Sequence, residues 1–311
     1  MCSLEEIFIV SNRVFENVID LMQGMWPTPM IRVSENAWAK LEFYNPISHS
    51  VKDRTALYLV LQAVKEGKRE LVETTSGNTG LAMAALASVL GLRFTVFLPG
   101  VASEGYKVLM RMFGAEVFDG KKTTIETLPL VKKFAEMTGA YHPDQFHNEL
   151  NVLVHYETTA REIEEQISSL NRRVERIIAS MGTGGHAVGI GKYFKEKYGR
   201  EVEVIGVVPA KGSRIPGIKR QDEGNPFDDR YKVIDEIVEV TDEDAYLGTR
   251  EVARKLGILV GLSSGAVYWA YSRFKNDGKT TVLVFPDDGF RYVEEFQELE
   301  KRVSGKGVTG I

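Results

Sequence analysis

The sequence predicts an α/β protein made of two open, twisted, parallel sheets that are covered by helices. Short β-rich segments alternate with helical patterns from Trp38 onward, and the alternation resumes after Asn148. Such alternation is typical of parallel sheets flanked by helices. The length of 311 residues also exceeds the roughly 100 to 200 residues of a usual domain. We therefore expect two α/β halves, divided near residues 141–151.

The expected elements follow in order along the chain. In the first half we expect strands at 38–44, Glu70–Thr74 and Arg93–Leu98, and helices that begin at Val51, Leu81 and Glu104. In the second half we expect strands at 174–180, 202–208 and Thr281–Phe285, and helices at 158–170, from His186 and at Asp242–Leu256. Residues 211–231 are rich in glycine, proline and charge, which is typical of a surface loop beside a site.

Composition and charge exclude several classes of function. The 39 basic residues are balanced by 43 acidic ones, so the formal charge of -4 gives no general attraction to nucleic acid or to a membrane surface. Cys2 is the only cysteine, which rules out an internal disulfide and a cysteine-rich zinc site, and we expect no metal ion. Residues 1–23 lack the pattern of a signal peptide, so we predict a cytoplasmic protein without a membrane span.

The first motif puts Lys52 at the start of a helix. It reads Asn-Pro-Ile-Ser-His-Ser-Val-Lys-Asp-Arg from residue 45, where a strand-like run meets a turn. Ser50 and Asp53 have the spacing of a helix cap with an acidic third residue, so Lys52 falls in the first turn. The positive end of the helix dipole then lowers the lysine pKa and favours the neutral amine that imine formation needs. In isolation, the pattern more often belongs to a solvated surface lysine.

The second motif is a polar loop at residues 73–80, Glu-Thr-Thr-Ser-Gly-Asn-Thr-Gly, between a strand and an alanine-rich helix. Backbone N–H groups in such a loop form a concave site for a carboxylate or phosphate. The side chains of Ser76, Asn78 and Thr79 add hydrogen bonds. A plain strand-to-helix turn with a capping residue is the structural alternative.

The third motif, Ser-Met-Gly-Thr-Gly-Gly-His at residues 180–186, again joins a strand to a helix. Its three glycines permit the close approach of a phosphate. Gly182, Gly184 and Ala187 also satisfy a loose dinucleotide pattern, but the next strand ends without the acidic residue which that signature needs. A nicotinamide site is therefore disfavoured, and His186 is interpreted as a helix-start residue.

Together, the three motifs match what pyridoxal phosphate and an amino acid require. The lysine would form the imine, one loop would hold the cofactor phosphate, and the other would hold the substrate carboxylate. The residues alone leave open which loop does which.

In their order and separations, these motifs resemble the fold-type II pyridoxal-phosphate family, specifically the cysteine synthases (O-acetylserine sulfhydrylases) and the related cystathionine β-synthases. The resemblance runs nearly end to end and includes His-Tyr-Glu-Thr-Thr from residue 155, Gly-Ile-Leu-Val-Gly-Leu-Ser-Ser-Gly-Ala from 257 and Pro-Asp-Asp-Gly-Phe-Arg-Tyr from 286. It implies a tryptophan synthase β-subunit-like fold. A smaller mobile domain at 38–148 would close over the substrate, and 1–37 plus 149–311 would form the larger, phosphate-binding domain.

The resemblance also implies roles for individual residues. Lys52 is expected to be the catalytic Schiff-base lysine, and Asn78 is expected to bond the phenolic oxygen of the cofactor. The other implied residues are Gly182, Thr183, Gly184 and Gly185 for the cofactor phosphate, Ser264 near the cofactor, and Thr75, Ser76, Thr79 and Gln145 for the substrate carboxylate.

Two departures from the family pattern bear on the chemistry. Relatives typically hold a neutral serine against the pyridine nitrogen, whereas this chain has Asp287 and Asp288; either carboxylate there would favour a protonated ring, unless both are turn residues. Residues 213–220, Ser-Arg-Ile-Pro-Gly-Ile-Lys-Arg, are similar to a segment of the B-type sulfhydrylases. Its basic side chains, Arg220 above all, would make O-phosphoserine a candidate donor, with a solvated loop as the alternative.

The function implied by the resemblance is that of a cysteine synthase. With pyridoxal phosphate, it would replace the β-substituent of O-acetylserine or O-phosphoserine by sulfide, by way of an α-aminoacrylate, to give L-cysteine. Lys52, once displaced, would take the α-proton as general base. A cystathionine β-synthase, a serine/threonine dehydratase and a non-catalytic pyridoxal-phosphate-binding regulatory protein are the alternatives. We also expect a homodimer with no nucleic-acid partner.

Overall fold

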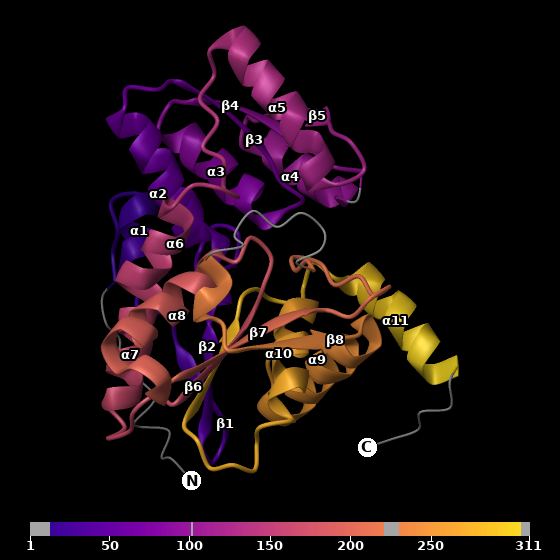
Figure 1. Ribbon diagram of the computed structural model, residues 1–311. Helices are drawn as coiled ribbons and strands as arrows, with labels where there is room; N and C mark the ends of the chain where they lie inside the picture. The colour runs from indigo at the N-terminus through magenta and orange to yellow at the C-terminus, as the bar shows by residue number, and fades with distance from the viewer. Residues whose placement is uncertain (1–12, 101, 221–229, 306–311) are drawn as a thin grey trace.

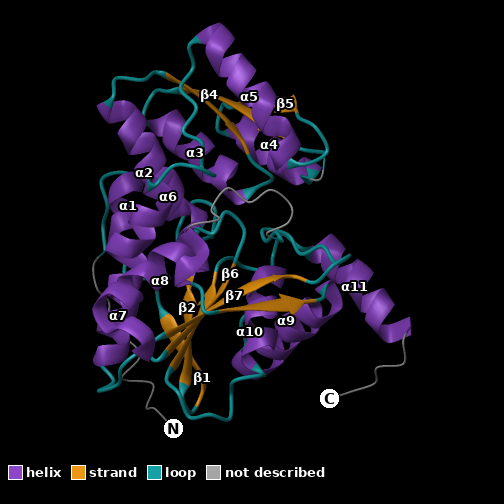
Figure 2. Cartoon of the chain, viewed as in Figure 1, coloured by secondary structure: helices purple, strands orange, loops and turns teal. Residues whose placement is uncertain are grey.

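The computed structural model describes residues 13–100, 102–220 and 230–305. It contains two sheets that lie in separate parts of the molecule (Figures 1 and 2). The larger sheet has six strands in the order β1-β2-β9-β6-β7-β8, and the smaller has three in the order β3-β4-β5. Cys2 and residues 221–229 of the expected loop lie outside the described residues.

The elements have the following bounds. The strands are β1 Met30–Ser34, β2 Ala37–Leu41, β3 Glu70–Thr74, β4 Arg93–Leu98, β5 Glu116–Asp119, β6 Arg176–Ser180, β7 Glu203–Pro209, β8 Glu236–Val240 and β9 Thr281–Phe285. The α-helices are α1 Val18–Gly24, α2 Lys52–Lys65, α3 Asn78–Val89, α4 Glu104–Met112, α5 Thr124–Thr138, α6 Leu150–Val154, α7 Ala160–Ser168, α8 Gly185–Tyr198, α9 Asp242–Leu256, α10 Leu262–Tyr271 and α11 Val293–Gly305.

The larger sheet is covered by helices on both faces, as Figure 1 shows. Every residue of β9 is buried, because a parallel strand inside such a sandwich has no face toward water. Val282 and Val284 pack on the side of α7 and α8, whereas Leu283 and Phe285 pack on the side of α9 and α10. This two-sided burial explains why the sequence of β9 is continuously apolar rather than alternating.

The smaller sheet is sandwiched in the same way. Its strands pair in parallel, and Leu71 also forms a parallel bridge to Tyr141. Apolar residues of α2 and α3 form one buried cluster with this sheet, and Val131 of α5 packs on Val72 and Phe97 at the other face. The predicted α/β class, with two open sheets, is therefore confirmed.

The boundary expected for the smaller domain falls inside a strand of the larger sheet. β2 pairs with β9, so residues 38–41 belong to the larger sheet by strand pairing. The expected strand 38–44 ends at Leu41 because Glu42–Tyr44 form a 3₁₀ turn. The first strand of the smaller sheet is therefore β3, and α2 connects the two parts of the molecule.

A buried charged cluster fixes the start of α2 against the larger sheet. Arg54 of α2 donates from Nε to Glu42 Oε2 at 2.7 Å and from Nη1 to Glu162 Oε1 at 2.6 Å. Lys40 Nζ of β2 donates to the same Glu162 at 2.7 Å, and the Arg54 guanidinium lies 4.5 Å from the centre of the Trp26 ring. Because Lys52 is two residues before Arg54, this cluster holds the backbone that carries it.

Among the described residues, none of the helices combines the length and the apolar character that crossing a membrane would require.

Candidate active site

A cavity of about 640 Å³ lies between the two parts of the molecule. It is lined where β3, β6, β7 and β9 end, and ligands of open α/β sheets bind at the carboxyl ends of the strands. Its volume is within the range of small-molecule sites, roughly 300 to 1,000 Å³. Nine residues predicted from the sequence line it: Lys52, Thr75, Ser76, Asn78, Thr79, Gln145, Gly182, Thr183 and Asp287.

Lys52 is the first residue of α2, and its side chain is half-buried in the cavity wall. Burial lowers its pKa to about 8, although the negative charge of Asp287 opposes that shift. The expected lowering of the pKa is therefore present, and burial is its largest cause. At neutral pH, an appreciable fraction of the amine is unprotonated.

The turn before Lys52 differs from the expected capping box. Ser50 Oγ accepts a hydrogen bond from Lys52 N at 3.1 Å, and the helix has no side-chain cap at Val51. Asp53 turns its carboxylate back to the N–H groups of Ile47 and Ser48, at 2.7 and 2.9 Å. Ser50 and Asp53 therefore both order this turn, but through separate contacts.

The loop after β3 is a rigid polar wall of the cavity. Thr79 Oγ1 donates to Gln145 Oε1 at 2.8 Å, and Gln145 Nε2 donates to Thr74 O at 2.9 Å. Thr75 Oγ1 accepts from the backbone N–H groups of residues 77 and 80 at 3.2 and 3.3 Å. These contacts bring Gln145 to the loop. Ser76 is exposed on the same wall.

Asn78 starts α3, three residues earlier than the sequence suggests, and its side-chain amide forms hydrogen bonds with residues of both parts of the molecule. Its Nδ2 donates to Asp287 Oδ2 at 3.0 Å, and its Oδ1 accepts from Tyr106 Oη at 2.6 Å and from Arg291 Nη1 at 2.5 Å. Arg291 also donates to Ser48 O at 2.6 Å. These contacts tie α3 and α4 to the segment after β9.

The glycine loop between β6 and α8 forms the opposite part of the cavity. Gly182 and Thr183 line it, whereas Gly184 and Gly185 lie just behind. Gly184 has a φ of 81°, which favours glycine, and a side chain on Gly182 would meet the carbonyl oxygen of Gly217 at 2.2 Å. Glycine is thus required here by the fold of the loop itself.

The C-terminal motif brings one aspartate into the cavity. Asp287 lines it and accepts from Ser263 Oγ at 3.3 Å and from the Tyr292 hydroxyl. Burial raises the pKa of Asp287, with the Tyr292 hydrogen bond opposing. Asp288 does not line the cavity; one of its carboxylate oxygens lies 3.5 Å from His49 Nδ1. Of the two expected carboxylates, only Asp287 faces the ligand space.

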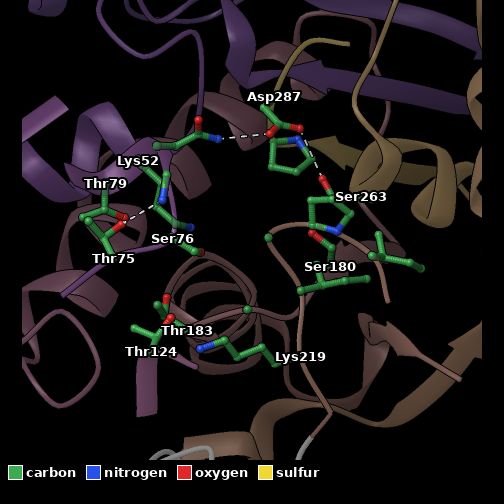
Figure 3. Close-up of a pocket in the computed structure, with 18 of the residues that line it drawn as sticks. Lys52, Thr75, Ser76, Thr79, Thr124, Ser180, Thr183, Lys219, Ser263 and Asp287 are labelled. Carbon is green, nitrogen blue, oxygen red and sulfur yellow. Dashed lines mark hydrogen bonds between the residues drawn. The ribbon is translucent and has the colours of Figure 1, made fainter. Parts of the chain in front are cut away.

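Two other predicted residues lie outside the cavity wall, and in each case a sequence neighbour takes the position. Ser264 donates its hydroxyl to Asp287 O at 3.3 Å, whereas Ser263 lines the cavity. Arg220 Nη1 donates to Glu239 Oε1 at 2.8 Å, whereas Lys219 lines the cavity over the Phe146 ring. Figure 3 shows Lys219 with Thr183 and Thr124 at one end of the view and Asp287 at the other, with Lys52 between.

The fold and the cavity define an α/β enzyme built in two parts. In the cavity, the amine of Lys52 lies between the N-terminus of α8 and the buried carboxylate of Asp287. α8 begins at the cavity without a side-chain cap from Gly184; the N–H of its first residue, Gly185, donates to Thr183 Oγ1 at 3.4 Å, and the N–H groups that follow point to a site suited to a phosphate. Lys52 supplies the amine that an aldehyde cofactor needs. These residues fit pyridoxal phosphate.

Comparison with known proteins agrees with this conclusion. Residues 21–287 match the family described as pyridoxal-phosphate dependent enzyme. Cysteine synthase B of Salmonella typhimurium is 34% identical, over 88% of this chain and 94% of the relative. The crystal structure of an O-ureido-L-serine synthase has a TM-score of 0.83 at 28% identity, covering 94% of this chain and 96% of that one. O-acetylserine sulfhydrylase isoform 3 of Entamoeba histolytica has a TM-score of 0.78 at 27% identity, covering 95% and 98%.

The chain therefore belongs to the family of pyridoxal-phosphate dependent enzymes. Its fold is that of the fold-type II members, as the sequence predicts, and its cofactor is pyridoxal phosphate.

Proposed function

We propose that this protein is a cysteine synthase, which replaces the β-substituent of an O-activated L-serine by sulfide to give L-cysteine. The observation that carries the proposal is the amine of Lys52, with its pKa of about 8, in one cavity with a polar loop and a glycine loop. The similarity to cysteine synthase B of Salmonella typhimurium supports it.

The residues of the cavity would divide the work as follows. When bound, pyridoxal phosphate supplies an electron sink for the negative charge that forms at the α-carbon. Lys52 Nζ takes the proton from that carbon as general base and later returns it. The residues that would hold the cofactor are Gly182, Thr183, Gly184 and Gly185 at the phosphate, Asn78 at the phenolic oxygen, Ser263 or Ser264 beside the ring, and Asp287 at the ring nitrogen.

The polar loop is suited to hold the carboxylate of the amino acid. Its backbone N–H groups and the exposed hydroxyl of Ser76 supply donors, and the bonds of Thr75, Thr79 and Gln145 keep the loop in one shape. Such preorganisation lowers the cost of orienting the substrate. Closure of the part of the molecule that carries the smaller sheet would then exclude water from the cavity.

Product analysis tests the function. The purified protein, loaded with pyridoxal phosphate, is given O-acetylserine and sulfide, and L-cysteine is expected to form in amounts that depend on both. Formation of cystathionine from serine and homocysteine in preference would identify a cystathionine β-synthase. A 2-oxo acid formed without any thiol would identify a dehydratase. No turnover by a protein that binds the cofactor would favour a regulatory protein.

The donor substrate is a further part of the proposal. Arg220 is paired with Glu239, but the ammonium of Lys219 lines the cavity, so we assign the contact with an anionic leaving group to Lys219. Lys219→Met should lower kcat/KM for O-phosphoserine, relative to O-acetylserine, by about tenfold or more, because charge-assisted hydrogen bonds contribute roughly 1.5 to 3 kcal/mol. The measurement is the ratio of kcat/KM for the two donors.

The matched control for that experiment is Arg220→Met. It removes a cation of the adjacent residue that does not line the cavity, so the ratio should stay at the wild-type value. Using the ratio cancels any effect on cofactor binding, which both donors share. An unchanged ratio in Lys219→Met would exclude the phosphate contact.

The homodimer and the cytoplasmic location expected from the sequence stay predictions. The mass in solution, measured by light scattering with size-exclusion chromatography, tests the first, and cell fractionation tests the second.

A further inference from the structure

His186 is a buried side chain whose ring nitrogens have no hydrogen-bond partner among the described residues. It is the second residue of α8, it is 3% exposed, and it lines the cavity. Neither of its ring nitrogens makes a hydrogen bond. Buried polar groups in folded proteins are nearly always bonded. An unpaired imidazole at the wall of a ligand cavity therefore indicates that a ligand supplies the missing partner.

The surroundings of His186 indicate an anion. It follows directly on the glycine loop, at the N-terminus of a helix of 14 residues that has no side-chain cap. The first N–H groups of such a helix and its dipole favour a negative charge. His186 lines the same cavity and adds an imidazole N–H donor to this helix end.

The neighbouring histidine is used differently. His155 is buried behind His186, with the two ring centres 6.0 Å apart. Its Nδ1 lies 2.9 Å from Thr159 Oγ1, and its Nε2 lies 3.4 Å from Thr55 Oγ1. His155 is thus satisfied inside the protein and supports the ring of His186 from behind. Of this pair, His186 is the one that faces the cavity.

We propose that His186 is a ligand of the cofactor phosphate and donates a ring N–H to one of its oxygens at the N-terminus of α8. The inference rests on the family membership and adds a residue that the sequence pattern alone assigns to the helix start. Burial, and then the charge of Lys52, lower the pKa of His186 to about 3, so the imidazole is neutral before an anion arrives. A neutral imidazole still has one N–H to donate.

Binding of pyridoxal phosphate and of pyridoxal to the cofactor-free protein tests this role. Both compounds carry the aldehyde that reacts with Lys52, but only the first carries a phosphate. In His186→Ala the dissociation constant for pyridoxal phosphate should rise about tenfold or more, as loss of a bond to a charged group would cause. The dissociation constant for pyridoxal should stay within about twofold of the wild-type value. His186→Gln, whose amide can donate, should recover part of the affinity.

Inorganic phosphate provides a second measurement. It should raise the melting temperature of the cofactor-free wild-type protein, because a ligand that binds the folded state stabilises it. The rise should be smaller in His186→Ala. His147→Ala is the matched control, because His147 is exposed and does not line the cavity.

The outcomes separate this inference from the proposed function. If His186→Ala weakens the binding of pyridoxal phosphate and of pyridoxal equally, or weakens the binding of neither, the role of His186 is overturned. If only the binding of pyridoxal phosphate is weakened, the role of His186 is upheld, whatever reaction the wild-type enzyme catalyses. Failure to form cysteine would count against the proposed function alone.

Discussion

Replacement of Lys52 by alanine should lower the rate of cysteine formation by at least about 10³-fold. The loss removes both the amine that attaches the cofactor and the base that takes the α-proton, and a general base alone contributes roughly 10²- to 10⁴-fold. The measurement is kcat with O-acetylserine and sulfide. After reduction with borohydride, mass spectrometry should find the cofactor on Lys52 in the wild type and on no residue in the variant.

Lys65→Ala is the matched control, because Lys65 is an exposed lysine at the far end of the same helix. It should keep the wild-type rate and the attached cofactor. Retention of more than about a tenth of the rate by Lys52→Ala would contradict the role of Lys52 as base.

The pH dependence follows from the lowered pKa of Lys52. The reactive form is the neutral amine, which dominates above the pKa of about 8 and falls about tenfold for each pH unit below it. Attachment of pyridoxal phosphate to the cofactor-free protein should therefore accelerate as the pH rises toward 8 and level off above it. A surface lysine with a pKa near 10.4 would still be accelerating at pH 9.

The sequence predicts the strands that carry the site because most of their residues are apolar or β-branched and are buried on both faces. β3, β4, β9 and α9 have the predicted bounds. The elements not foreseen are α1, β1, β5, α5, α6, β8, α10 and α11. β5 and β8 are mostly exposed strands at the sheet edges, so their apolar runs are too short for an assignment.

The helix predicted at 158–170 shows a different limit. In the structure, helix α6 comes first, a π-helical turn follows at His155–Thr159, and α7 then covers most of the predicted range. A π turn disrupts the usual helical period, and such turns often occur at functional sites. Periodicity alone therefore shows only the last part of this helix. The turn is also what holds His155 behind His186.

In the site, local motifs predict which loops meet but not which side chain of a pair faces the cavity. Ser263 and Ser264 differ by one position on a helix, and a rotation of about 100° between successive residues decides which one faces the ligand. Lys219 and Arg220 are also neighbours of which only one lines the cavity, but they lie in a loop, where no regular period predicts which side chain faces the ligand. Tyr106 comes from α4 with no motif around it, and only the tertiary structure brings it to Asn78.

Replacement of Arg54 by methionine should lower the free energy of unfolding by about 3 to 5 kcal/mol, because it leaves buried carboxylates without their cation. Arg54 is completely buried, and both Glu42 and Glu162 accept hydrogen bonds from it. Denaturant unfolding, followed by circular dichroism, measures the change. Arg54→Met combined with Glu42→Gln should recover part of it, because one unpaired charge is then removed.

Acid should reduce the difference in the free energy of unfolding between the wild type and Arg54→Met. Burial opposes the ionisation of Glu42, but the charge and hydrogen bond of Arg54, together with the charge of Lys40, outweigh it and lower the pKa of Glu42 to about 2. A lowered folded-state pKa stabilises the protein above the unfolded value of about 4.3, and this contribution is lost as the pH falls toward the folded one. A difference in the free energy of unfolding that stays constant from pH 7 to pH 3 would exclude the ion pair as the source of the lost stability. A difference that disappears would show that the ion pair between Arg54 and Glu42, at the start of α2, stabilises the folded protein.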